Sequence, residues 1–248
     1  MSHHMPQRHA SLPVLPHAQS LLRRISWVSV LLLAACSSAP IAPIWQGEAK
    51  DALDRANAAY LEGDSRVALA EMTRVRRAIS GTGRADWLAN AELAHCAAQV
   101  ASLVLEPCHA FEALRADATA AQIAYADYLR AQIKPGTPAA TLALLPAVQQ
   151  GIASQPNADA AALKSLADPL SRLVGAAVWL QKGQASPAVI EVALETSSHQ
   201  GWRRPLLAWL GVQAQRAEQA GNTAELERLR RRMALVEGRS EGRSRATP

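Results

Sequence analysis

The sequence predicts an all-α protein built from antiparallel helical hairpins, stacked as a solenoid or packed as a bundle. Aromatic residues make up only 4% of the chain. Ala is abundant and runs of β-branched residues are nearly absent, which favours helix over strand. Apolar residues recur at helical spacing through most of the chain, and Gly, Pro and capping side chains interrupt them at short intervals. Because the turns are short, consecutive helices are expected to lie antiparallel.

Five helices are predicted in an N-terminal hairpin segment, residues 46–134. Gly63 suits the end of the first helix, and Asp64 suits the start of the second. Thr119 and Gln122 have the spacing of a capping box at the start of the fifth. The apolar stripe of the second helix consists of Val67, Leu69, Met72, Val75 and Ile79. The first stripe covers 49–60, and the later helices are expected at about 85–105, around 111–114 and at about 119–133.

A break at Lys134-Pro135-Gly136 separates this segment from a C-terminal hairpin segment, residues 137–238. Three helices there share a start signal, a capping residue followed by a Pro that the first helical turn tolerates. Pro146 is expected to kink or split the first helix. The three signals are Thr137-Pro138, Asp168-Pro169 and Ser186-Pro187. Helices are expected at about 138–153, 158–167, 169–182, 187–198 and 202–220, and from Gly221-Asn222-Thr223 to about Gly238.

The N-terminal segment has the parts of a secretory signal. Arg23 and Arg24 supply positive charge, residues 25–33 supply a short apolar run, and residues 1–36 contain no Asp or Glu. The run is far shorter than the roughly 20 apolar residues that cross a bilayer as a helix. It ends in Leu33-Ala34-Ala35-Cys36, which resembles the lipobox of a bacterial lipoprotein signal peptide. An ordinary signal peptide that ends near a Cys is the alternative.

The lipoprotein resemblance implies a membrane anchor. It implies a signal peptide over residues 1–35, cleavage between Ala35 and Cys36, and acyl chains on the sulfur and the new amino group of Cys36. Two or more acyl chains give a stable anchor. In such families Asp after the Cys favours retention in the inner membrane. Because Ser37 stands there, we expect the outer membrane, facing the periplasm, with the inner membrane as the alternative, and a lipidated tether over residues 36–45.

The charge distribution gives no sign of nucleic-acid binding. The chain has 26 Lys and Arg against 21 Asp and Glu, but three of the Arg precede Cys36. Seven Arg fall in residues 228–248. The last part of this stretch, residues 239–248, is expected to form a disordered basic tail. A nucleic-acid binder carries its charge on the folded body, often with interleaved aromatics. The body of this chain is slightly acidic instead.

Two cysteines follow Cys36, and each has a His beside it: His95-Cys96 and Cys108-His109. In an oxidising periplasm we expect a Cys96–Cys108 disulfide that pins the end of one helix to the start of the next. Two free buried thiols are one alternative. A two-Cys, two-His metal site is another, but adjacent residues point to different faces of a helix, whereas zinc ligands pair at short, regular spacing.

Two turns resemble the middle of tetratricopeptide repeats. They lie in Ala58-Ala59-Tyr60-Leu61-Glu62-Gly63-Asp64 and in Ala217-Glu218-Gln219-Ala220-Gly221-Asn222, and the following Ala68 and Ala224 fit the small residue of the second repeat helix. The turn from Gly183 to Ser186-Pro187 is similar. The spacing from Gly183 to Gly221 is 38 residues, against 34 in that family. The resemblance covers about a third of the chain after Cys36 and implies a TPR-like solenoid.

Catalytic signatures are missing from the sequence. It has no Gly-x-Ser-x-Gly, no phosphate-binding Gly loop and no His-Glu-x-x-His, so no catalytic residue, cofactor or metal is assigned and a hydrolase is the least favoured class. Trp179, Trp202, Arg203, Arg204 and Trp209 are the candidate surface for a peptide or glycan. The alternative is that the tryptophans form a core stripe and the arginines a solvated face.

These observations favour a membrane-anchored binding protein. The lipobox, the helical hairpins and the lack of a catalytic motif predict a periplasm-facing outer-membrane lipoprotein that acts as an adaptor or scaffold in envelope assembly or secretion. Its partners would be the membrane, through the lipid on Cys36, and an envelope protein. The alternative is a binder of a small molecule, a lipid or a peptidoglycan fragment in a pocket among the Trp-bearing helices.

Overall fold

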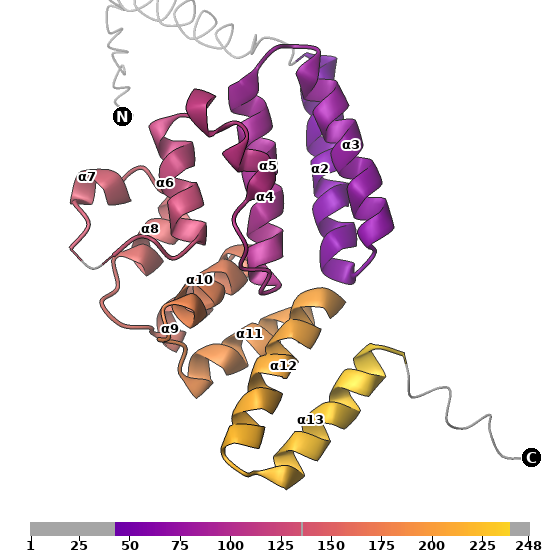
Figure 1. Ribbon diagram of the computed structural model, residues 1–248, viewed down its shortest axis with the longest axis vertical. Helices are drawn as coiled ribbons and strands as arrows, with labels where there is room; N and C mark the ends of the chain where they lie inside the picture. The colour runs from indigo at the N-terminus through magenta and orange to yellow at the C-terminus, as the bar shows by residue number, and fades with distance from the viewer. Residues whose placement is uncertain (1–42, 135, 239–248) are drawn as a thin grey trace, which may run out of the picture. The chain divides into compact units, whose positions relative to one another are not determined.

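The computed structural model describes residues 43–134 and 136–238, and over these residues the protein is all-helical with no strand (Figure 1). This confirms the predicted all-α class. None of the described helices is long and apolar enough to cross a bilayer. The predicted signal peptide, the lipidated Cys36, most of the tether and the basic tail over 239–248 lie outside the described residues.

The helices follow one another with short connections. They are α2 (Ile44–Glu62), α3 (Ser65–Ser80), α4 (Ala85–Ala101), α5 (His109–Glu112), the 3₁₀ helix η1 (Arg115–Asp117), α6 (Ala120–Leu129), α7 (Ala139–Leu142), α8 (Ala147–Ala153), α9 (Ala160–Ser165), α10 (Pro169–Gln181), α11 (Pro187–His199), α12 (Arg203–Gln219) and α13 (Thr223–Val236).

The three turns that look alike in sequence share one hydrogen-bond geometry. Gly63, Gly183 and Gly221 all have positive φ. In each turn the amide after the Gly donates to a carbonyl oxygen five residues earlier, as in the Schellman motif. For Asp64 and Asn222 these N···O distances are 2.8 and 2.9 Å. Both side chains also accept a hydrogen bond from the next helix and so cap its first turn.

Most of the predicted start signals are confirmed. Asp168 and Ser186 cap α10 and α11, each with Pro in the first turn, and Thr119 and Gln122 form a full capping box. Pro146 splits the predicted helix into α7 and α8. Thr137 is the exception, because its hydroxyl donates to the carbonyl oxygen of Lys134 at 2.8 Å and caps no helix.

Two helices end earlier than predicted. α4 ends at Ala101 rather than near 105, and α6 ends at Leu129 rather than near 133. In both, a residue other than Gly adopts the left-handed conformation after the cap: Leu103 has φ 60° and Ala131 has φ 56°. The chain makes the same Schellman hydrogen bonds there as at the glycine turns. Since neither residue is Gly, the sequence carried no signal for these ends.

The core is continuous across the break at residues 134–136. α10 packs on α4, and one large apolar cluster joins residues from both hairpin segments, including Phe111, Tyr128, Trp179 and Trp209. A smaller cluster holds α2 and α3 together and reaches α4 through Ala91. Helix α4 therefore contributes to both clusters.

Helix α12 contacts α2, at the opposite end of the described chain. Arg204 of α12 donates to the carbonyl oxygen of Tyr60 at 2.6 Å, and the indole Nε1 of Trp209 donates to the carbonyl oxygen of Ala101 at 3.2 Å. In a strictly linear solenoid each repeat contacts only its neighbours. These contacts instead bring the first hairpin, α4 and the C-terminal helices together.

Candidate functional site

The five residues of the predicted binding surface do not form one face. Trp179 and Trp209 are 2% and 0% exposed and lie in the large core cluster. This corrects the surface prediction for these two residues, because a partner cannot reach side chains enclosed by α4, α10 and α12. The alternative, a core stripe, describes their position.

The remaining three residues of that predicted surface differ in burial and in the contacts that they make. Trp202 is half-buried and packs against the large core cluster. Arg203 is exposed to solvent, whereas the guanidinium of Arg204 lies over the Tyr60 ring and donates to Ser65 Oγ at 2.6 Å. Arg204 therefore joins α12 to the α2–α3 hairpin.

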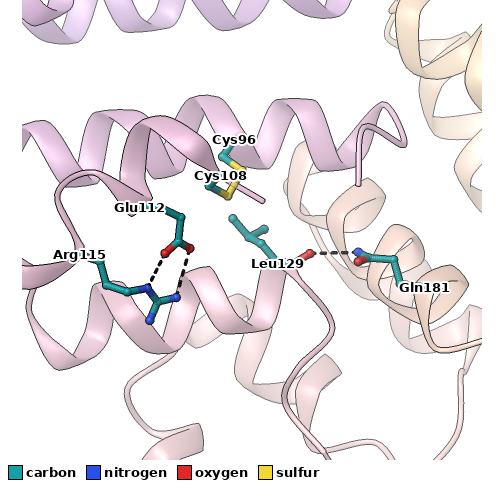
Figure 2. Close-up of a disulfide and its surroundings, with 6 residues drawn as sticks. All are labelled: Cys96, Cys108, Glu112, Arg115, Leu129 and Gln181. Atoms are coloured by element: carbon teal, nitrogen blue, oxygen red, sulfur yellow. Dashed lines mark hydrogen bonds and ion pairs between the residues drawn. A yellow bond between two sulfur atoms is a disulfide. The ribbon is translucent and has the colours of Figure 1, made fainter. Parts of the chain in front are cut away.

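Cys96 and Cys108 form a disulfide with Cα atoms 5.7 Å apart (Figure 2). It links α4 to the residue that precedes α5, as the sequence analysis expects. Both cysteines are 4% exposed. With both sulfur atoms in this bond, neither is a thiolate available to a metal. The two neighbouring histidines lie in different environments. His95 contacts Asn57, with 2.9 Å from Nδ1 to Oδ1, whereas His109 is exposed.

The segment after the disulfide is held by ion pairs. Figure 2 shows the carboxylate of Glu112 facing the guanidinium of Arg115, with 2.7 Å from Nε to Oε2. Arg115 also reaches Asp127 on α6, at 2.8 Å. The hydrogen bond from Arg115 lowers the pKa of Glu112. The two ion pairs together join α5 and η1 to α6. The chain here is thus held at Cys108 by the disulfide and at Glu112 and Arg115 by this charge network.

A pocket of about 250 Å³ opens beside the disulfide. We call it the disulfide pocket. It is defined here by Leu69, Met72, Glu92, Val104, Cys108 and Phe111.

Exposed apolar side chains form the rim of the disulfide pocket. Leu69 is 65% exposed and Val104 is 39% exposed, whereas Met72 and Phe111 below them are buried. The sequence placed Val67 and Leu69 in the apolar stripe of this helix, but both are exposed. The buried face of α3 contains Ala68 together with the predicted Met72, Val75 and Ile79. Large apolar side chains gathered at a surface recess are typical of contact sites.

Part of the polar wall of the disulfide pocket is internally paired. Arg76 donates two hydrogen bonds to the Glu92 carboxylate, at 2.6 and 2.9 Å, and the Glu92 side chain is only 4% exposed. This hydrogen bonding raises the pKa of Arg76. Burial lowers the pKa of His95, so its ring is neutral at neutral pH, and the contact with Asn57 Oδ1 requires the proton on Nδ1. The pocket thus presents apolar surface beside the paired charges of Arg76 and Glu92, while Glu106 and His109, which also line it, are exposed.

A second, wider groove lies on the other side of α4. Its volume is about 630 Å³, and it is lined by α4, α6 and residues near 145 and 170, including Leu93, Gln122, Tyr125 and Leu144. Burial, reinforced by Asp168, raises the pKa of Tyr125. Gln122 Nε2 donates to the carbonyl oxygen of Asp86 at 2.7 Å and so holds α6 to α4. We call this the Tyr125 groove.

No protein-family model, curated protein or solved structure matches the chain. The sequence patterns indicated neither recess. The only signal for the disulfide pocket was the cysteine pair, which marks the Cys108 side of the recess but not Leu69. The Tyr125 groove had no local signal, because its walls come from segments that only the packing of α6 and α10 against α4 brings together.

Proposed function

We propose that the protein is a lipoprotein anchored in the outer membrane through Cys36, and that its helical domain binds an envelope protein as an adaptor or scaffold. The lipobox-like sequence supports the anchor. The disulfide supports export, because such bonds form and persist in oxidising compartments.

The proposal includes TPR-like hairpins at the two ends of the domain. Support comes from the α2–α3 and α12–α13 pairs, which use the same Gly turn followed by a capping Asp or Asn. Between them, α5 to α9 are short and irregular. The architecture proposed is therefore a bundle with a TPR-like hairpin at each end.

The observation that carries the adaptor proposal is the disulfide pocket. An apolar side chain of a partner that enters it would cover Leu69 and Val104 and contact the buried floor formed by Met72 and Phe111. A few anchor residues that fill such pockets supply most of the energy of a protein interface. The disulfide restrains the segment that carries Val104, which lowers the entropy lost on binding.

Site-specific photo-crosslinking in intact cells tests this proposal. A photoreactive amino acid replaces Leu69 in the full chain, and the matched control carries it at Leu235, which is also 65% exposed but lies on α13. We expect one discrete protein adduct at position 69 and none at 235. Val104→Asp should abolish the adduct and Leu235→Asp should preserve it. Equal adducts at both positions, or none at 69, would contradict the proposal.

The Tyr125 groove favours a second candidate function, the binding of a small molecule, a lipid or a peptidoglycan fragment. Its volume falls within the roughly 300–1,000 Å³ typical of ligand sites, and it combines apolar walls with a few polar groups. This replaces the predicted pocket among the Trp-bearing helices, whose Trp179 and Trp209 are core residues. Native mass spectrometry of the chain extracted from cells should then find a bound mass that Ala94→Phe, which fills the groove, removes.

A further inference from the structure

An exposed isoleucine and two tryptophans lie together where the described chain begins. Ile44, the first residue of α2, is 82% exposed. The rings of Trp45 and Trp87 meet edge to face with centroids 5.0 Å apart, and both are half-buried against the smaller core cluster. We call Ile44, Trp45, Arg84 and Trp87 the N-terminal edge.

The side chains of the N-terminal edge suit apolar contact with the membrane interface rather than electrostatic contact through positive charge. Tryptophan, with an apolar body and one polar N–H, is enriched at the level of lipid headgroups. Arg84 lies 5.8 Å from the centre of the Trp87 ring, but Asp86 neutralises its charge through two hydrogen bonds of 2.9 and 2.7 Å. Contact with lipid here would therefore be mainly apolar.

The length of chain before α2 places this edge near the proposed lipid. Six residues lie between Cys36 and Pro43, so the two Cα atoms are at most about 25 Å apart in a fully extended chain. Helix α2 is itself 19 residues long, or about 28 Å. The α2–α3 turn, with Leu69 just beyond it, therefore lies about one helix length from Ile44 (Figure 1).

We propose that the N-terminal edge rests on the lipid surface, with Ile44, Trp45 and Trp87 in its interfacial region, and that this contact turns the disulfide pocket away from the bilayer. The inference rests on the proposed lipid anchor at Cys36. It adds an orientation: the domain lies with the start of α2 against the membrane and presents Leu69 to the periplasm.

Photo-crosslinking to phospholipid tests the orientation in the full chain. The photoreactive amino acid is placed at Ile44, with Leu69 and Leu235 as exposed apolar controls. Cells are labelled with radioactive phospholipid precursor, and the N-terminal peptide is analysed for lipid on Cys36 in the same samples. We expect phospholipid adducts at position 44 and only background at 69 and 235, with unchanged adduct yield in high salt.

The outcomes separate the two proposals. A chain that carries lipid on Cys36 but gives no adduct at 44, or equal adducts at 44 and 69, would overturn the orientation and leave the anchor intact. A chain without lipid on Cys36 would overturn the anchor, and the orientation with it. A matching thermal midpoint for the three labelled chains checks that each is folded.

Discussion

The guanidinium of Arg204 lies 4.2 Å from the centre of the Tyr60 ring, and its Nε donates to the carbonyl oxygen of the same residue at 2.6 Å. That oxygen belongs to the last turn of α2, where carbonyl groups carry partial negative charge, and it also accepts a hydrogen bond from the Gly63 amide at 3.1 Å. Burial raises the pKa of the Tyr60 phenol, and the charge of Arg204 opposes this. A side chain 144 residues away in sequence thus caps the first helix.

Arg204→Ala is expected to lower the free energy of unfolding by roughly 1–3 kcal/mol, because it removes a cation–π contact and charge-assisted hydrogen bonds. The adjacent Arg203 is exposed, and Arg203→Ala should change stability by less than about 0.5 kcal/mol. Urea unfolding of the two variants and the parent gives the comparison. Equal effects of the two substitutions would show that the contact with Tyr60 contributes nothing.

Ala131→Gly is expected to stabilise the fold. Ala131 has φ 56°, a conformation that costs a residue with a Cβ about 1 kcal/mol or more and costs Gly nothing. After the greater entropy loss of Gly, we expect a net gain of about 0.5 kcal/mol. The same substitution at exposed Ala70, inside α3, should destabilise by about 1 kcal/mol. Thermal midpoints that shift in opposite directions would support this, and a fall in both would contradict it.

The sequence predicted those features that depend on neighbouring residues. Gly63 with Asp64, Thr119 with Gln122, and Asp168 before Pro169 are local devices, since each satisfies backbone groups within one turn. Most helix starts followed from them, whereas the all-helical class followed from the composition and from the helical spacing of the apolar residues. The ends of α4 and α6 did not, because the left-handed residues there are Leu103 and Ala131 rather than Gly.

The candidate site could be predicted only where its signal is local. Trp202 and Trp209 lie one heptad apart, but this spacing does not say whether their face is covered, and packing with α4 buries Trp209. Leu69 fits an apolar stripe equally well as a core or a rim residue. The Arg204–Tyr60 contact needs the position of α12 against α2, which no short segment encodes.

Reduction of the Cys96–Cys108 bond is expected to lower stability by about 2–4 kcal/mol. The bond closes a loop with a sequence separation of 12, and a loop of about 15 residues gives roughly 3 kcal/mol in the chain-entropy treatment. Reductant added to the parent chain isolates this effect without the cavity that Cys→Ala would create. Non-reducing peptide mapping should recover the joined pair. Two free thiols in freshly exported protein, or a midpoint that reductant leaves unchanged, would contradict the prediction.

Stability should fall as the pH drops below about 6.5, because His95 is buried in a neutral form. Burial is the main cause that lowers its pKa; Arg76 and Arg204 add to the effect and Glu92 opposes it. In the unfolded chain the pKa of His95 is near 6.5, and in the folded protein it is lower. At a pH between these two pKa values, mainly the unfolded state binds the proton. The contribution of His95 to the free energy of unfolding is therefore fully present above about pH 6.5 and is lost as the pH falls. The slope can reach about 1.4 kcal/mol per pH unit. Urea unfolding between pH 7.5 and about 5 avoids the main titration of carboxylates, which lies near pH 4.

His95→Gln should flatten this slope, since Gln can still donate to Asn57 Oδ1 but does not titrate. The matched control is His199→Gln, whose ring is exposed on the end of α11 and which should keep the slope of the parent. The variant therefore separates the titration of one buried ring from any general effect of pH on the fold. A slope that survives in His95→Gln, or a parent whose stability is constant down to pH 5, would show that His95 does not remain neutral in the folded protein.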